Sequence, residues 1–177
     1  DRDEFLRKVH DGTVEELLNA IPVKAGDCFL IKAGTVHAIG AGCVICEVQQ
    51  SSNVTYRVYD YNRRDANGNL RQLHVEKAVD VINFHAFRDE TGGGKVQSTA
   101  GGKIRLLTEC EYFCCRELQL NGTYLETADR SFLTVNVLEG EGTVNGEPYV
   151  AGDCFFLPCG ESAQLQGIGK MILTTKP

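Results

Sequence analysis

The stretch Ala25-Gly-Asp-Cys-Phe-Leu-Ile-Lys-Ala-Gly-Thr-Val-His37 recurs in altered form as Ala151-Gly-Asp-Cys-Phe-Phe-Leu-Pro-Cys-Gly-Glu-Ser-Ala163. Each copy predicts a turn, a short apolar strand, a second tight turn and a returning strand, because glycine permits such turns between apolar runs. The second copy carries Ala163 where the first carries His37. The repeat therefore predicts two copies of one β unit, of which only the first has an imidazole at this position.

Period-two patterns dominate the rest of the chain. Short runs rich in Val, Ile, Phe, Thr and Tyr, separated by turns, predict strands over residues 28–61 and again from residue 104 to the end. Within the second set, Gly140-Glu-Gly142 predicts a hairpin turn.

Helical spacing is confined to two places. Apolar residues share a helix face in residues 5–20, where Thr13 and Glu16 form a capping-box pattern, and again in residues 74–82. Residues 88–102 are rich in glycine and predict a loop or linker. We therefore expect a mainly β fold with a few short helices.

Composition bears on partners and compartment. The 177 residues carry a net charge of −6, so the basic excess that nucleic-acid binding needs is missing. No apolar run approaches the roughly 18 residues of a membrane span, and the start, Asp1-Arg-Asp-Glu4, is unlike a signal peptide. We expect a soluble, cytoplasmic protein with no nucleic-acid or membrane partner. Its eight cysteines lie mostly in apolar runs, which predicts buried, reduced thiols.

Residues 26–37 follow the pattern G-x5-K-x-G-x-x-H, which resembles the second signature of the cupin superfamily, whose His is a metal ligand. Four blocks of sequence make the resemblance specific to one family within this superfamily. They are Ala33-Gly-Thr-Val-His-Ala-Ile-Gly40, Glu47-Val-Gln-Gln-Ser-Ser-Asn53, Tyr56-Arg-Val-Tyr-Asp-Tyr61 and Leu73-His-Val-Glu-Lys-Ala-Val-Asp-Val-Ile82. Together they resemble the type I mannose-6-phosphate isomerases, especially the short bacterial form. The residues from Gly26 to Phe84 carry the specific part, and the C-terminal third resembles a degenerate cupin.

This resemblance implies cupin, or double-stranded β-helix, repeats in two copies, the first incomplete. The implied domains are a helical segment at 1–20, the C-terminal part of a metal-binding cupin at 21–61, a connector with one helix at 62–102 and a metal-free C-terminal cupin at 103–177.

The resemblance also implies a zinc-dependent aldose–ketose isomerase that interconverts mannose 6-phosphate and fructose 6-phosphate. His37 would be one zinc ligand, and Arg57 the active-site arginine that binds substrate oxygens. The family's other zinc ligands belong to an upstream region with no counterpart here, and Met171 is the only methionine. We therefore expect the C-terminal part of an isomerase that binds zinc weakly and is inactive in isolation, because one His cannot complete a catalytic zinc site.

Other interpretations stay open. A non-enzymatic bicupin module that binds a sugar or a protein is favoured by Ala163 and by the missing ligands, whereas a cupin dioxygenase would need an H-x-H pair that the chain lacks. Lys32 replaces the usual proline of the motif, and Ser52-Asn53 stands where many relatives have an acid, so the general base is not identified. Arg63-Arg64 predicts a solvated turn. An incomplete first cupin would expose strand edges, which predicts homo-oligomers or pairing with another chain.

Overall fold

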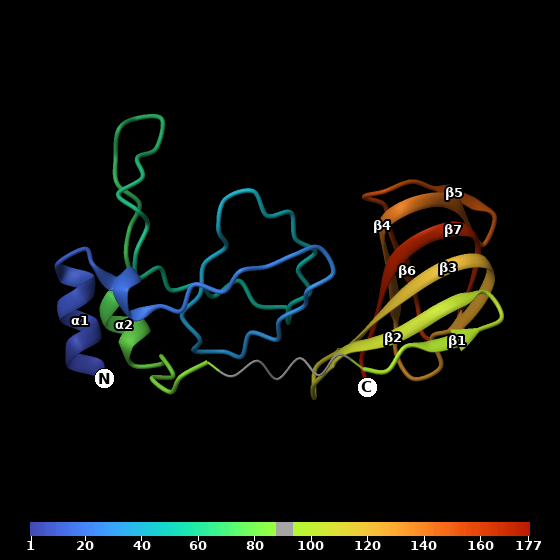
Figure 1. The fold of residues 1–177 in the computed structure, drawn as a ribbon, viewed down its shortest axis with the longest axis horizontal. Coiled ribbons are helices and arrows are strands. Elements are labelled where there is room, and N and C mark those ends of the chain that lie inside the picture. The colour runs from blue at the N-terminus through green and yellow to red at the C-terminus, as the bar shows by residue number, and fades with distance from the viewer. Residues whose placement is uncertain (88–93) are drawn as a thin grey trace. The chain divides into compact units, whose positions relative to one another are not determined.

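The computed structural model describes residues 1–87 and 94–177 and divides into two compact units, Asp1–Arg88 and Asp89–Pro177 (Figure 1). The described part of the predicted linker, residues 94–102, is not all loop, because Gln97–Thr99 forms a short strand that pairs with the next one. The rest of that linker lies outside the described residues. No helix among the described residues is long and apolar enough to cross a membrane.

The N-terminal unit is built on two short α-helices and one 3₁₀ turn: α1 (Arg2–His10), η1 (Val14–Leu17) and α2 (Val75–Val79). Asp1 caps α1 by accepting the Glu4 amide at 2.8 Å. The capping box predicted at Thr13 is wrong, because its side chain makes no capping hydrogen bond and η1 is a single 3₁₀ turn. A helix predicted at residues 74–82 is present but shorter, since α2 spans only Val75–Val79.

These helices share a small apolar cluster. Its buried members are Phe5, Val14 and Val79. Val58 and Tyr59, which arrive from the extended segment before α2, pack against it. The cluster thus joins the helices to the segment that carries Arg57.

The strands predicted over residues 28–61 are absent, and these residues form turns and irregular segments instead. A β-strand exists where its backbone hydrogen-bonds to a neighbouring strand. Residues 28–61 have no such neighbour among the described residues of this unit. Apolar side chains stay exposed as a result, and Val44 is 100% accessible. The prediction of buried thiols is wrong at the four exposed cysteines, Cys43, Cys46, Cys154 and Cys159. None of the eight cysteines forms a disulfide.

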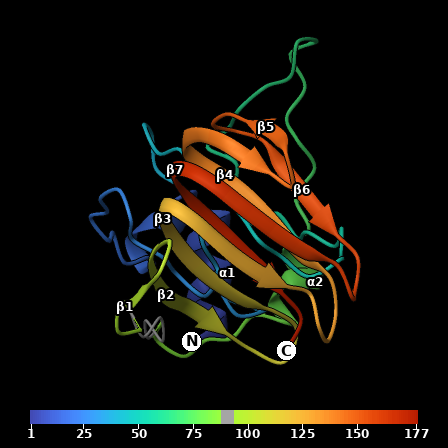
Figure 2. The ribbon, with the colours of Figure 1, turned by 90° about the vertical axis from the view of Figure 1, so that its right-hand side faces the viewer.

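The C-terminal unit is one antiparallel sheet (Figure 2). Its strands are β1 (Gln97–Thr99), β2 (Gly102–Glu109), β3 (Cys114–Thr127), β4 (Leu133–Val144), β5 (Glu147–Tyr149), β6 (Cys154–Leu157) and β7 (Ser162–Thr175). The order is β1-β2-β3-β7-β4-β5, and β6 pairs with β4. The prediction of a mainly β fold is confirmed.

The sheet is strongly curved. Arg116 and Glu126 both lie on β3, ten residues apart, yet their side chains meet at 2.9 Å. Ten residues of straight strand would span about 33 Å, so β3 must bend back on itself. The concave side holds the core, with Leu118, Leu165 and Leu173 fully buried.

The hairpin turn predicted at Gly140-Glu-Gly142 is wrong, because both glycines lie inside β4. They stand opposite Gly169 and Gly167 of β7 in the ladder. The chain turns instead at Asn145-Gly146, where both residues have positive φ, 51° and 87°. These glycines therefore let β4 and β7 lie close together, and they do not reverse the chain direction.

The two repeat copies have matching turns. Asp27 accepts the Lys24 amide at 2.9 Å, and Asp153 accepts the Val150 amide at 2.8 Å in the same way. The second turns also match, since Gly34 and Gly160 have φ values of 83° and 90°. The residues between the turns differ, because only the second copy forms a strand there, β6.

Candidate functional site

His37 follows a turn that is anchored against the end of α2. The Gly34 carbonyl accepts the Asn83 amide at 2.9 Å. A Cβ at Gly34 would lie 2.5 Å from the Val81 carbonyl oxygen, so only glycine fits this approach. The motif glycine therefore sets the position of the chain three residues before His37.

The His37 ring is exposed, and its tautomer follows from its contact. Nδ1 lies 2.8 Å from the Thr35 carbonyl oxygen. Because a carbonyl only accepts, Nδ1 carries the proton and Nε2 of the neutral ring presents its lone pair. That is the arrangement of a metal-binding histidine.

The described residues do not complete a metal site around His37. Among residues 1–87 and 94–177, no group of three or more His, Cys, Asp or Glu side chains is placed to hold an ion. Zinc sites use three or four protein ligands. His37 is therefore suited to be one ligand, and these residues alone do not fit a zinc centre.

Arg57 is fixed by its backbone to the start of α2. The His74 amide donates to the Arg57 carbonyl at 2.7 Å, and the Arg57 amide donates to His74 Nδ1 at 3.3 Å. The side chain is 25% exposed. Its Nη1 donates to the Gln72 carbonyl at 3.4 Å, and its Nε lies 3.8 Å from Asp60 Oδ1. Most of its five N–H donors stay uncommitted to described residues.

Asp60 gathers three guanidinium groups. It is 6% exposed, and its Oδ1 lies 2.6 Å from Arg63 Nη2, 3.5 Å from Arg71 Nη1 and 3.8 Å from Arg57 Nε. Its Oδ2 is buried without a hydrogen bond to any described residue. Three cations around one carboxylate leave a local excess of two positive charges, which favours an anionic ligand.

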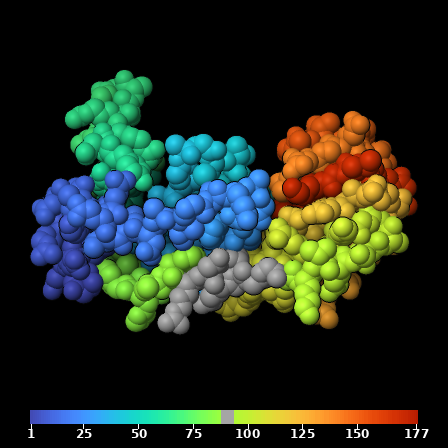
Figure 3. Space-filling view, viewed as in Figure 1, coloured from blue at the N-terminus to red at the C-terminus, as the bar shows by residue number. Residues whose placement is uncertain are grey.

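Arg63 and Arg71 lie near the two ends of an arm, residues 61–73, that projects from the N-terminal unit (Figure 3). An isolated bridge between Arg64 and Leu70 closes the arm. At its tip Asp65 accepts the Asn67 and Asn69 amides, and chiefly the Asn69 bond lowers the pKa of Asp65. The arm brings Arg71 back to Asp60.

His37 and Arg57 lie in the same unit, but no hydrogen bond or ion pair joins them within the described part of the chain. The predicted strand around Arg57 is absent, so no strand directs its side chain. The predicted solvated turn holds for Arg64, which bonds the Gly68 carbonyl, but Arg63 pairs with Asp60. The sequence did not lead us to predict Asp60 as a site residue. Its position between apolar residues was the signal that could have identified it, because a buried carboxylate often marks a functional site.

Comparison with known proteins places the chain in a family. Residues 103–176 match the family model of the mannose-6-phosphate isomerase cupin domain. Mannose-6-phosphate isomerase ManA of Bacillus subtilis is 36% identical over 98% of this chain and 56% of that protein. The chain belongs to the mannose-6-phosphate isomerase family.

Other mannose-6-phosphate isomerases agree. The Streptococcus mutans enzyme is 38% identical over 89% of this chain and 50% of its own length. The crystal structure of the mannose 6-phosphate isomerase from Bacillus subtilis superposes with a TM-score of 0.89 at 34% identity, covering 98% of this chain and 57% of that one. The chain thus spans about half the length of the mannose-6-phosphate isomerases it matches. The family model matches within the C-terminal unit, the third of the chain that resembles a cupin in sequence.

Proposed function

We propose that this chain carries part of the active site of a zinc-dependent mannose-6-phosphate isomerase, which interconverts mannose 6-phosphate and fructose 6-phosphate. His37 contributes one zinc ligand and Arg57 binds substrate oxygens. The observation that carries the proposal is the Arg57 guanidinium, held at its backbone and surrounded by surplus positive charge. Family membership supports the same reaction.

The reaction moves a proton between neighbouring carbons through an enediol, so negative charge develops on the substrate oxygens. Fixed cations stabilise such charge best when they are already in place. Arg57 meets this condition, because its backbone is bonded to His74 on both sides and Asp60 holds its Nε. Since the described residues do not form a complete zinc site, substrate binding is the role that they can fill themselves.

The domain plan is part of the proposal. We place a helical segment at 1–20, part of a metal-binding cupin at 21–61, a connector at 62–102 and a metal-free cupin at 103–177. The matching turns at Gly34 and Gly160 support two copies, and Ala163, fully buried in the apolar core, supports the lack of metal in the second. The cytoplasm suits an enzyme of sugar-phosphate metabolism.

The exposed apolar side chains of residues 21–61, which form no strand, support association. Val44, Val54 and Ile39 are 100%, 67% and 57% exposed, and exposed apolar side chains favour burial against another chain. We propose that this segment pairs with another β segment, in a homo-oligomer if no other chain is present. Light scattering that finds only monomers would contradict homo-oligomers.

The alternative is a non-enzymatic bicupin module that binds a sugar or a protein. It is favoured by Ala163 and by the incomplete ligand set around His37. A binding module for a neutral sugar or a protein does not require the three guanidinium groups at Asp60. We prefer the isomerase because that cluster suits a phosphorylated substrate.

One titration tests the proposal. We expect mannose 6-phosphate to shift the backbone amide resonances of Arg57 and His74 in the 177-residue chain. Arg57→Ala should weaken this binding about tenfold, because a hydrogen bond to a charged group contributes about 1.5–3 kcal/mol. Arg64→Ala, on the exposed arm, is the matched control and should leave the binding unchanged.

The same sample tests the fragment proposal and the role of Arg57. We expect no isomerase turnover and only weak zinc binding from this chain, because His37 lacks companion ligands among the described residues. Tight stoichiometric zinc or measurable turnover would contradict the fragment proposal. Equal sugar-phosphate binding by Arg57→Ala and the native chain would contradict the role of Arg57.

A further inference from the structure

The C-terminal unit holds charged side chains on its core-facing side. Successive residues of a strand face opposite sides, so Arg116, Tyr124 and Glu126 share a face of β3 with Leu118 and Leu120, which are buried. A guanidinium and a carboxylate thus point toward a core that is otherwise almost entirely apolar.

These three side chains form one network. Arg116 donates to the two Glu126 carboxylate oxygens at 2.9 and 3.3 Å, and the Tyr124 hydroxyl donates to Glu126 at 2.7 Å. Burial and this hydrogen bond to Glu126 raise the pKa of Tyr124 to about 12. Arg116 Nε is buried and has no hydrogen bond to any described residue, so the network keeps an unused donor.

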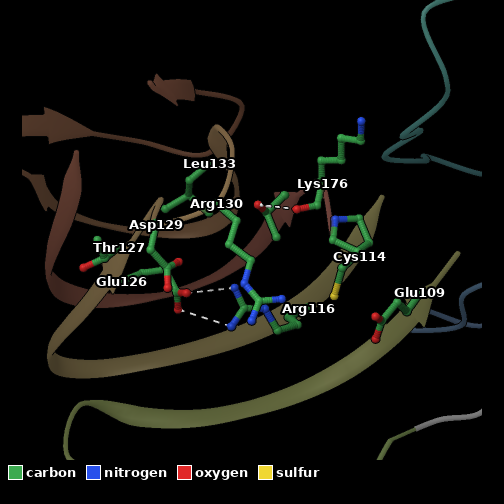
Figure 4. A pocket seen from close by; sticks show the side chains of 11 residues that line it. Glu109, Cys114, Arg116, Glu126, Thr127, Asp129, Arg130, Leu133 and Lys176 are labelled. Carbon is green, nitrogen blue, oxygen red and sulfur yellow. Dashed lines mark hydrogen bonds and ion pairs between the residues drawn. The ribbon is translucent and has the colours of Figure 1, made fainter. Parts of the chain in front are cut away.

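A cavity of about 250 Å³ adjoins the network. It is lined by the start and end of β3, the loop after it and the end of β7, through residues that include Cys114, Arg116, Glu126, Arg130, Thr175 and Lys176 (Figure 4). In Figure 4 the Arg130 side chain reaches from its loop toward the Arg116–Glu126 pair. The volume suits a ligand smaller than those of typical drug-binding pockets, which are about 300–1,000 Å³.

The cavity offers cations that the protein does not use. The side chains of Arg130 and Lys176 make no ion pair with any residue in the described part of the chain, unlike Arg116, which is held by Glu126. The remaining charges are the carboxylates of Glu109 and Asp129, both exposed residues. Free cations bind an anionic group, and carboxylates and the threonine hydroxyls accept from ligand hydroxyls.

The partly buried Arg116–Glu126 pair is weak evidence for a purely stabilising role. A buried ion pair is commonly no more stabilising than well-packed apolar residues of the same volume. Its place in the repeat is also informative, because Glu126 pairs across the ladder with Ala163, the position that aligns with His37 in the first copy. The second copy thus has an Arg–Glu–Tyr network beside the position of the first copy's imidazole.

We propose that this cavity is a second ligand site, for a small phosphorylated compound that carries hydroxyl groups. The phosphate binds Arg130, with Arg116 behind it, and the hydroxyls meet Asp129 and Glu109. Lys176, whose side chain points away from the Arg116–Glu126 pair in Figure 4, adds positive charge at the rim. The site lies wholly within the C-terminal unit and does not depend on the role proposed for Arg57.

The test is a residue-resolved NMR titration of the 177-residue chain with mannose 6-phosphate as probe. We expect saturable shifts at the amides of Arg130, Leu133 and Thr175. Arg130→Ala should weaken this binding about tenfold, as expected for the loss of a hydrogen bond between charged groups. Lys103→Ala, an exposed lysine on β2 outside the cavity, should have no effect. Unphosphorylated mannose should leave these amides unshifted.

Lys176→Ala provides a second variant at an exposed position and should also weaken binding. Either variant is informative only while its spectrum stays that of the native fold, which the amides of Leu118 and Leu165 report. The proposal is overturned if mannose 6-phosphate leaves the cavity amides unshifted, or if both variants bind as the native chain does. Shifts confined to Arg57 and His74 would likewise overturn it while leaving the isomerase proposal intact.

Discussion

Gly140→Ala is expected to unfold the C-terminal unit at temperatures where the native chain is folded. The residue has φ of +100°, and a Cβ there would lie 2.0 Å from the Ile168 carbonyl oxygen and 2.4 Å from Gly169 Cα. Both atoms belong to the backbone of β7, so no side chain can move aside. The variant must separate β4 from β7, which are paired along most of their length.

The expected loss is more than about 4 kcal/mol, a range reached only by such clashes and comparable defects. For a unit of this size each kcal/mol lowers the melting temperature by about 4–8 °C, so circular dichroism should show a fall of roughly 15–30 °C. Gly146→Ala is the matched control, since its φ is +87° but its Cβ would meet nothing within 4 Å. It should cost only about 1–2 kcal/mol of backbone strain. Equal melting of the two variants would contradict the clash.

Asp60→Ala is expected to loosen the N-terminal unit and its arm. The substitution leaves the guanidinium groups of Arg57, Arg63 and Arg71 without their shared counter-ion. Removing one partner of a fully buried ion pair costs about 3–5 kcal/mol. Because Arg63 and Arg71 are half exposed, we expect Asp60→Ala to lower the free energy of unfolding by about 2 kcal/mol. This is less than the loss expected for a fully buried pair, and it lies within the usual range for single substitutions.

Hydrogen exchange at the His74 amide measures this loss, since that amide bonds to Arg57. Asp80→Ala is the control, because it removes the exposed ion pair with Arg2, and such pairs contribute about 0–1 kcal/mol. Faster exchange at His74 in Asp60→Ala alone is the expected outcome. If both variants exchange alike, Asp60 does not organise the cluster.

Local patterns predicted the C-terminal unit well and the N-terminal unit poorly. Leu118 and Leu120 alternate with polar neighbours, and their strand finds partners within the chain, so pattern and structure agree. Residues 43–50, which begin with the apolar run 43–46, have the same β character. A ladder also needs a partner strand, which local sequence does not supply. Propensity predicts extended backbone there and cannot predict pairing.

The candidate sites show the same division. His37 and Arg57 were found by motif, since each lies in a distinctive block. Asp60 and Arg71 meet only because the arm returns, and Arg116 meets Glu126 only because β3 curves. Neither contact has a spacing that a periodic pattern would show, because both depend on how the chain bends between the two residues.

The position of β7 has a consequence for how the C-terminal unit folds. This last strand lies between β3 and β4, so Cys114 pairs with Thr175, far along the chain. Contacts so distant in sequence slow folding, because a long loop must close before they form. During synthesis, the edges of β3 and β4 that pair with β7 stay unpaired until β7 has left the ribosome. The sheet is therefore completed only once β7 has emerged, with two unpaired strand edges exposed to aggregation until then.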